Sequence, residues 1–189
     1  MSSFRRLAIP EVVEIFPQRH FDERGFLSET YEASAFAAEG LPAEWPQENH
    51  SYSDSAGTVR GLHFQVPPAA QAKLVRVVSG AIFDVAVDLR KGSGTYGRWV
   101  GTELSAERWN QLYVPAGFAH GFMTLTRETH VLYKLTAPYS PGHEGAIRWD
   151  DPDIAIDWPQ PPAAPTCSER DMSAASFAGF ETPFRTEAT

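Results

Sequence analysis

Hydrophobic residues recur at every second position in several short segments of the chain, which is the pattern of a strand with one buried face. Between residues 81 and 89 the hydrophobic side chains fall on one face, and Asp84 and Asp88 fall on the other. The segment Lys73–Val78 alternates in the same way, and the Ser-Gly dipeptide at 79–80 predicts a hairpin turn between the two. Further strands are expected at 99–104, 111–114 and 129–135.

The pattern predicts one helix, and it is short. Ser34 is a suitable N-cap for a helix over Ala35–Glu39, and Gly40 and Pro42 end it. Fifteen prolines and fourteen glycines separate the strand-like segments with turns. Many short strands with a few short helices predict an all-β fold of the sandwich, jelly-roll or barrel type.

A length of 189 residues suits one domain, and we expect a single domain over residues 1–189. The character of the chain changes near residue 159, where four prolines within seven positions predict a stiff, extended segment. The C-terminal segment, about 159–189, also carries Phe177, Phe180 and Phe184. These rings suit either the surface of their own domain or a partner chain, and the sequence leaves both open.

Composition and charge narrow the classes of function. The formal net charge of −8 disfavours nonspecific binding of nucleic acid, although a few clustered arginines still suit an anionic small ligand. No segment approaches the ~20 apolar residues of a membrane span. The N-terminal residues lack the apolar run of a signal peptide. We therefore expect a cytoplasmic protein that binds neither nucleic acid nor membranes.

Patterns that resemble cofactor or metal sites carry little weight here. The G-x-G-x-x-G run from Gly92 to Gly97 precedes a strand-like segment, whereas a dinucleotide site needs a helix there, so we expect a loop. Cys167 is the only cysteine, which excludes an intrachain disulfide and Cys-based zinc sites. His63 and His120 alone fall short of the three protein ligands usual for a catalytic metal, so we expect no metal.

One set of residue types points to proton transfer next to a carbonyl group. His63 lies in the segment R-G-L-H-F-Q (60–65), and Lys73, His120 and Tyr133 come from three other segments. Histidine titrates near neutrality and can act as a base, a lysine ammonium can hydrogen-bond a developing enolate oxygen, and tyrosine can donate a proton from the opposite side. Each of these residues taken alone is more often structural, so the hypothesis depends on the set.

The order of the motifs resembles that of the dTDP-4-dehydrorhamnose 3,5-epimerases, a sugar-nucleotide epimerase family of the cupin superfamily. The resemblance runs from about Val12 to Asp171. Matching segments include H-F-D-E-R-G-F (20–26), Q-E-N-H-S (47–51), R-G-L-H-F-Q (60–65), Q-A-K-L-V-R-V (71–77), V-P-A-G-F-A-H-G-F (114–122) and S-E-R-D (168–171). It implies a cupin-type jelly-roll barrel with its core at about 45–140, a homodimer that exchanges N-terminal strands, and no metal or redox cofactor.

The same resemblance implies catalytic roles. His63 would be the base, held and polarised by Asp171. Lys73 would steady the C4 enolate, Tyr133 would be the acid on the other face, and His120 would contact the sugar near that centre. The implied reaction inverts C3 and C5 of a dTDP-4-dehydro-6-deoxyhexose in deoxysugar biosynthesis of the dTDP-rhamnose type. The C4 ketone acidifies both hydrogens, and each proton returns on the opposite face.

The nucleotide half of the implied substrate also has matching positions. Arg24 and Arg60 suit the diphosphate, because a guanidinium binds phosphate oxygens through paired charge-assisted hydrogen bonds. Tyr139 matches the residue expected to stack on thymine. The other positions that match substrate contacts are Glu29, Gln47, Glu48, Asn49, Glu144 and Arg170, and the last of these stands where the family usually has Lys.

Three alternatives stay open at this point. Relatives that invert only C3 or only C5 keep the same acid and base, so the motifs do not separate them from a double epimerase. A metal-dependent cupin is a rival from another class, and a noncatalytic sugar-nucleotide binding module is a second.

Cys167 replaces the Leu that the family usually has just before the S-E-R-D motif.

Overall fold

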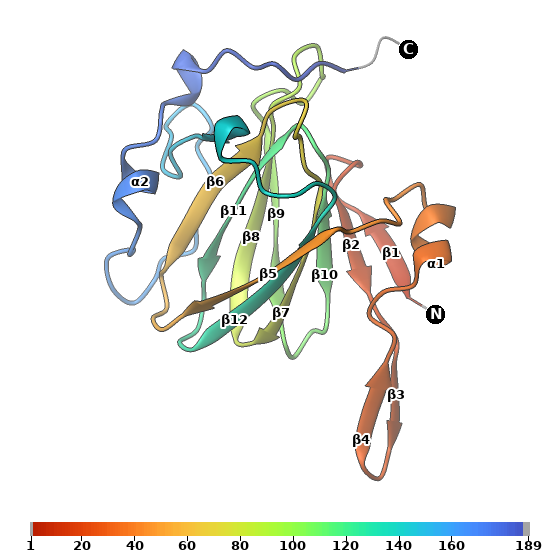
Figure 1. Ribbon diagram of the computed structural model, residues 1–189. Helices are drawn as coiled ribbons and strands as arrows, with labels where there is room; N and C mark the ends of the chain where they lie inside the picture. Colours follow the sequence, from red (N-terminus) through yellow and green to blue (C-terminus); the bar gives the residue numbers. More distant parts are fainter. Residues whose placement is uncertain (1, 187–189) are drawn as a thin grey trace.

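The computed structural model describes residues 2–186 and consists mostly of strands (Figure 1). The strands are β1 (Ser3–Arg6), β2 (Val13–Phe16), β3 (Arg19–Asp22), β4 (Gly25–Ser28), β5 (Gln47–Ser53), β6 (Val59–Gln65), β7 (Lys73–Ser79), β8 (Ala81–Asp88), β9 (Trp99–Ser105), β10 (Gln111–Val114), β11 (Phe118–Thr124), β12 (Thr129–Leu135) and β13 (Glu144–Ala146). The helical elements are α1 (Ala33–Ala38), α2 (Glu169–Met172) and two short turns, η1 (Pro141–His143) and η2 (Phe177–Gly179). The five strands predicted from alternation are confirmed.

Two antiparallel sheets pack face to face and form the body of the molecule (Figure 1). The larger sheet has six strands in the order β1-β2-β10-β7-β12-β5, and the smaller has five in the order β13-β6-β11-β8-β9. The main hydrophobic core lies between them and includes Val75, Val77, Ala86, Leu112 and Phe122. The prediction of an all-β jelly-roll fold with a few short helices is therefore confirmed.

The turn at Ser79 and Gly80 does not close a hairpin, so that prediction is wrong. β7 pairs with β10 and β12 in the larger sheet, whereas β8 pairs with β9 and β11 in the smaller one. The turn carries the chain from one sheet to the other, and Gly80 adopts a φ of 80° there. Alternation predicts a strand and its faces, but the packing of the two sheets decides which strands pair.

The helix expected after residue 34 is present as α1, but its cap differs from the prediction. The carboxylate of Glu32, not the hydroxyl of Ser34, accepts hydrogen bonds from the amides of Ser34 and Ala35, at 2.9 and 2.7 Å. A negative charge at the N-terminus also interacts favourably with the helix dipole. Phe36 anchors α1 on the outer face of the larger sheet. Among the residues described, no helix is long and apolar enough to cross a membrane.

The C-terminal segment covers the outer face of the smaller sheet of its own protomer. Phe180 and Phe184 pack edge-on against Phe64 of β6, and Phe177 belongs to the same apolar cluster. This position of the tail decides between the two alternatives that the sequence left open.

The segment that contains the G-x-G-x-x-G run is a loop between β8 and β9, as expected.

The hairpin of β3 and β4 projects away from the body of the molecule (Figure 1). Its hydrophobic side chains have little cover, since Phe21 is 69% exposed and Leu27 is 77% exposed. Arg24, at the tip, is bonded only to Asp22 of the same hairpin among the interactions described. Exposed apolar side chains on an isolated hairpin are typical of a surface that another chain covers.

Candidate active site

A cavity of about 450 Å³ lies between the two sheets. Its chemical groups come from four strands and one helix: His63 of β6, Lys73 of β7, His120 of β11, Tyr133 of β12 and Asp171 of α2. An adjoining hollow of about 150 Å³ shares His63, Lys73 and Tyr133 with it. The structure therefore brings together all four residues predicted for catalysis, together with His120.

A β-bulge in β6 turns Arg60 and His63 toward this same cavity. His63 is the register partner of His120, and Arg60 is the partner of Phe122, so two residues of β6 lie opposite one of β11. Without the extra residue, positions three apart would point to opposite faces of the sheet. Gly61 makes the bulge possible, because a Cβ there would lie 2.5 Å from the Cα of Gly121.

His63 and Asp171 form a hydrogen-bonded pair that the fold brings together across 108 residues of sequence. Nε2 of His63 lies 2.6 Å from Oδ1 of Asp171, and the backbone amide of Gly61 donates to Oδ2 at 3.3 Å. Burial opposes ionisation of Asp171, but these bonds and the attraction of the imidazole outweigh it and lower its pKa. The ionised carboxylate places the proton of His63 on Nε2 and leaves Nδ1 as the basic nitrogen.

α2 presents Asp171 because its first turn is capped. The hydroxyl of Ser168 accepts a hydrogen bond from the Asp171 amide at 3.1 Å. The chain beyond the helix is held on the smaller sheet, where Ala175 bridges to Ile147 and the Phe177 amide donates to Asp151. The long tail thus fixes Asp171 beside His63.

Lys73 is buried against the cavity wall, with only 8% of its surface exposed. Its Nζ donates to the carbonyl oxygen of His63 at 3.1 Å. Burial lowers the pKa of Lys73 to about 8, although attraction from Asp84 and Glu144 offsets part of that effect. A lysine with this pKa is charged at neutral pH and can lose its proton in mildly alkaline solution.

His120 lies next to His63 and is bonded to a carboxylate of its own. Its Nε2 is 2.9 and 3.1 Å from the two carboxylate oxygens of Asp84 on the neighbouring strand β8. Burial lowers the pKa of His120, and the attraction of Asp84 offsets only part of this. Sequence reasoning placed Asp84 on the polar face of its strand but gave it no role. That face lies between the two sheets, where Ile82 and Ala86 of the same strand belong to the main core, so it is also buried.

Tyr139, Glu144 and Arg170 form a second polar cluster beside His63 and Lys73. The Tyr139 hydroxyl donates to Glu144 at 2.7 Å, and the Arg170 guanidinium pairs with the same carboxylate oxygen at 2.8 Å. Burial opposes ionisation of Glu144, but its two partners outweigh burial and lower its pKa. The ring of Tyr139 is half-exposed, which leaves a face free for stacking.

Gln47 and Asn49 support this end of the site from β5. The Gln47 amide nitrogen donates to the Asn49 side chain at 2.9 Å, and its amide oxygen accepts from the backbone of Tyr139 at 2.7 Å. Asn49 lines the smaller hollow and is the register partner of Tyr133. Arg60 lines the larger cavity and donates to the carbonyl oxygen of Tyr52 at 2.9 Å.

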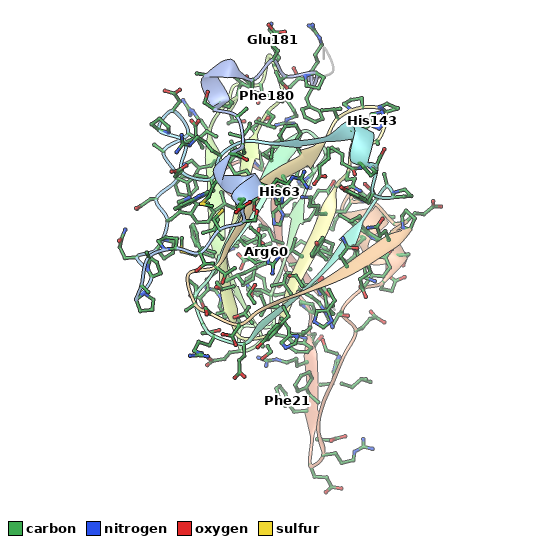
Figure 2. All side chains as sticks on the ribbon, turned by 60° about the vertical axis from the view of Figure 1, so that its left-hand side comes forward. Phe21, Arg60, His63, His143, Phe180 and Glu181 are labelled. Carbon is green, nitrogen blue, oxygen red and sulfur yellow. The ribbon has the colours of Figure 1, made fainter. Side chains whose placement is uncertain are left out.

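Three residues predicted to bind substrate lie away from the cavity of their own protomer. Arg24 is at the tip of the projecting hairpin, the part of the molecule that Figure 2 marks with Phe21, far below His63. Glu29 is exposed in the connection between β4 and α1. Glu48 lies on the outer face of the larger sheet, where it pairs with Lys134 at 2.8 Å. One chain by itself therefore does not gather the whole predicted set.

In the described part of the chain, no three His, Cys, Asp or Glu side chains converge in a way that could hold a metal ion. Each of the two cavity histidines instead directs Nε2 to a carboxylate.

Comparison with known proteins decides the family. The family model described as dTDP-4-dehydrorhamnose 3,5-epimerase matches residues 6–179. The chain belongs to this family. A dTDP-4-dehydrorhamnose 3,5-epimerase of Sinorhizobium fredii is 50% identical over 182 residues, which cover 96% of this chain and 93% of that protein.

Solved structures of this family have the same fold. The dTDP-6-deoxy-D-glucose-3,5-epimerase of Legionella pneumophila, in complex with dTDP-4-keto-L-rhamnose, superposes with a TM-score of 0.94 at 38% identity and covers 100% of both chains. A 3′-monoepimerase of Streptomyces bikiniensis, in complex with dTDP-quinovose, superposes with a TM-score of 0.85 at 35% identity, over 91% of this chain and 86% of that one. The fold thus serves relatives that invert two centres and relatives that invert one.

Proposed function

We propose that the protein inverts C3 and C5 of a dTDP-4-dehydro-6-deoxyhexose, in deoxysugar biosynthesis of the dTDP-rhamnose type. The observation that carries this proposal is the His63–Asp171 pair, which faces the same cavity as Lys73 and Tyr133. A base, a cation and a phenol around one space are the groups that enolisation next to a ketone requires.

The base in this mechanism is His63. Its Nδ1 removes the hydrogen from a carbon next to the C4 ketone, and the electron pair of that bond moves onto the ketone oxygen to form an enolate. The imidazole becomes a cation, and the carboxylate of Asp171, 2.6 Å from Nε2, stabilises it. This bond also holds the ring in the tautomer that leaves Nδ1 free.

The enolate oxygen is stabilised by the ammonium group of Lys73. The charge of the ammonium group stabilises the enolate more strongly in a buried site than in water, because the local dielectric constant is lower. Tyr133, on β12 of the opposite sheet, donates the proton that returns to carbon from the other face. Proton removal on one side and proton delivery on the other invert the centre, and the ketone reforms.

The nucleotide is held by groups at the rim. Tyr139 stacks on the thymine base, an interaction worth about 1–3 kcal/mol per base in nucleic-acid sites. Arg60 and Arg170 bind the diphosphate, and Gln47, Asn49 and Glu144 orient these groups and the substrate. Arg170 stands in the position of a family Lys and presents a planar guanidinium that can bind two phosphate oxygens at once.

We infer that the active form is a cytoplasmic homodimer in which the hairpin of one protomer reaches the cavity of the other. Arg24 and Glu29 do not line the cavity of their own protomer, yet both match substrate-contacting positions. The exposed rings of the hairpin are consistent with burial against a second copy. Glu48, on the outer face of the larger sheet, would join the site only through this assembly.

The test is proton exchange in D₂O followed by NMR of the product. Deuterium at both C3 and C5 is the expected result, and label at one carbon alone would reject double epimerisation. The alternative function is inversion at a single centre, and the 3′-monoepimerase relative favours it.

The two rivals from other classes have their own outcomes. Activity that a chelator abolishes and iron restores would identify a metal-dependent cupin. Binding of dTDP without any solvent exchange would identify a noncatalytic sugar-nucleotide binding module.

A further inference from the structure

Asp84 is a fully buried carboxylate in the wall of the candidate active site. It is 0% exposed and lies in the middle of β8, a central strand of the smaller sheet. Burying an ionised carboxylate is costly unless hydrogen bonds or opposite charges compensate for it. The partners of Asp84 therefore indicate what it does.

The hydrogen bonds described for the Asp84 side chain join both oxygens to one nitrogen, Nε2 of His120. Asp88, four residues later on the same strand and also 0% exposed, is different. It accepts from Arg90, Ser93 and Thr95 and so holds the β8–β9 loop in place. Asp88 serves the fold, whereas the bonds of Asp84 lead to a group that lines the cavity.

The first consequence concerns the protonation of His120. An ionised carboxylate on Nε2 keeps the proton on that nitrogen. Burial keeps the ring neutral, so Nδ1 carries a lone pair. His120 then offers the cavity a hydrogen-bond acceptor. The ligand group that fits an acceptor is a hydroxyl of the sugar, since a ketone oxygen or an enolate needs a donor instead.

The second consequence concerns the charge of Lys73. The titratable and charged groups that share its cavities are Arg60 and His63 of β6, His120 of β11, Tyr133 of β12, Glu144 of β13, and Cys167, Arg170 and Asp171 of the C-terminal segment. Asp84 of β8 is bonded to His120 in the wall of the same cavity, and its charge attracts the Lys73 ammonium. Of the other carboxylates, Glu144 is already paired with Arg170, and Asp171 with His63. On β9 the register partner of Asp84 is Thr102, whose hydroxyl contacts buried Glu14 and adds no positive charge.

We propose that Asp84 is a positioning residue of this site: it holds Nε2–H of His120 so that Nδ1 accepts a hydrogen bond from a sugar hydroxyl, and its charge keeps Lys73 in the ammonium form. The sugar-hydroxyl part rests on the proposed function. The tautomer and the lysine charge follow from the protein alone, which allows the two to be tested separately.

The tautomer is tested in the wild-type protein by ¹⁵N NMR of the histidine side chains. The expected result is a neutral His120 with the proton on Nε2. A proton on Nδ1 in the substrate-free protein, or a doubly protonated ring at neutral pH, would overturn the proposal. This measurement requires no variant and no turnover, so its outcome is independent of whether the chain is an epimerase.

The charge is tested with Asp84→Asn, which keeps an acceptor for His120 and removes the negative charge. The Nζ titration of Lys73, followed by NMR, and the alkaline limb of the deuterium-exchange rate are both expected to move down by about one pH unit. Asp88→Asn is the matched control, because it removes a buried charge from the same strand and leaves both unchanged. Identical titrations in wild type and Asp84→Asn would refute the role.

A purely structural role for Asp84 predicts another pattern, in which both variants lower the melting temperature and neither moves the pH profile. That pattern would also overturn the proposal. Absence of exchange in the wild type would instead contradict the proposed function and leave the NMR titrations to decide on Asp84.

Discussion

The cavity holds two histidine–carboxylate pairs whose histidines lie on adjacent strands, β6 and β11, and the two pairs differ in exposure. The side chain of His63 is 30% exposed and meets a carboxylate from the C-terminal helix, whereas that of His120 is 7% exposed and meets one from the next strand. An imidazole that reaches solvent can accept a proton and release it again. A buried imidazole keeps one protonation state and is suited to orienting a ligand. The difference between the pairs is one of burial, since the residue types are the same.

The sharpest test of this comparison removes the proton acceptor. His63→Asn is expected to lower deuterium exchange by about 10⁴-fold or more, because the variant lacks the proposed base. Affinity for dTDP, measured by calorimetry, should stay within a few-fold of wild type. His143→Asn, a histidine of η1 bonded to Ser140 outside the larger cavity, is the control. Exchange at the wild-type rate in His63→Asn would disprove the assignment of the base.

Removing the charge of Asp171 tests whether the exposed pair works as a unit. Asp171→Asn is expected to slow exchange by about 10²-fold or more, because the imidazolium that forms loses its counter-charge. Asp150→Asn, whose carboxylate pairs with Arg148 on the surface, should behave like wild type. A rate for Asp171→Asn within threefold of wild type would leave His63 without its proposed partner.

The pH dependence of the wild type tests Lys73. Activity should fall as pH rises through about 8, because the ammonium group that stabilises the enolate loses its proton there. Stability responds in the opposite direction. The unfolded lysine still holds its proton between that pH and its ordinary pKa, so the free energy of unfolding contributed by this group rises with pH.

Lys73→Met should remove both effects and lower the exchange rate at every pH. Lys134→Met is the control, since that side chain lies on the outer face of the same sheet beside Glu48. A rate that stays constant from pH 7 to well above 9 in the wild type would contradict the role of Lys73.

The smallest effect is expected at the rim, where no proton moves. Tyr139→Ala should weaken dTDP binding by about 5- to 100-fold, in line with the loss of one stacking contact worth about 1–3 kcal/mol. The maximal exchange rate should change little. Tyr96→Ala, which removes an aromatic ring packed at a tilt against Phe177, is the control. Unchanged affinity in Tyr139→Ala would remove this residue from the nucleotide site.

The sequence singled out His63, Lys73, His120 and Tyr133 because the chemistry of a candidate proton-transfer set is visible in residue types and motif order. The structure places these four residues around one cavity, and their catalytic roles stay a prediction. Asp84 was missed because alternation in a single strand does not distinguish a solvent-facing side from a second buried side. The signal in the sequence was a charged residue in the middle of a strand. It becomes informative only when the fold places that strand at the centre of its sheet.

Arg60 is a second residue whose orientation the local sequence pattern does not predict. Three positions separate it from His63, so a regular strand would point the two side chains to opposite faces. The bulge opposite Gly121 brings both into the cavity. A bulge depends on how two strands pair, and pairing involves residues about sixty positions apart, so no local pattern predicts it.

By itself, the amino-acid sequence determined the all-β class, the strands with their alternating faces, the family resemblance and the candidate proton-transfer groups, because these follow from local residue order. Only the tertiary structure decided that β7 and β8 belong to different sheets, that the tail covers its own protomer, and that Arg24 lies away from its own cavity. The physical reason is that burial and long-range pairing are properties of the packed chain, and they give the two identical side chains of His63 and His120 different exposure to solvent.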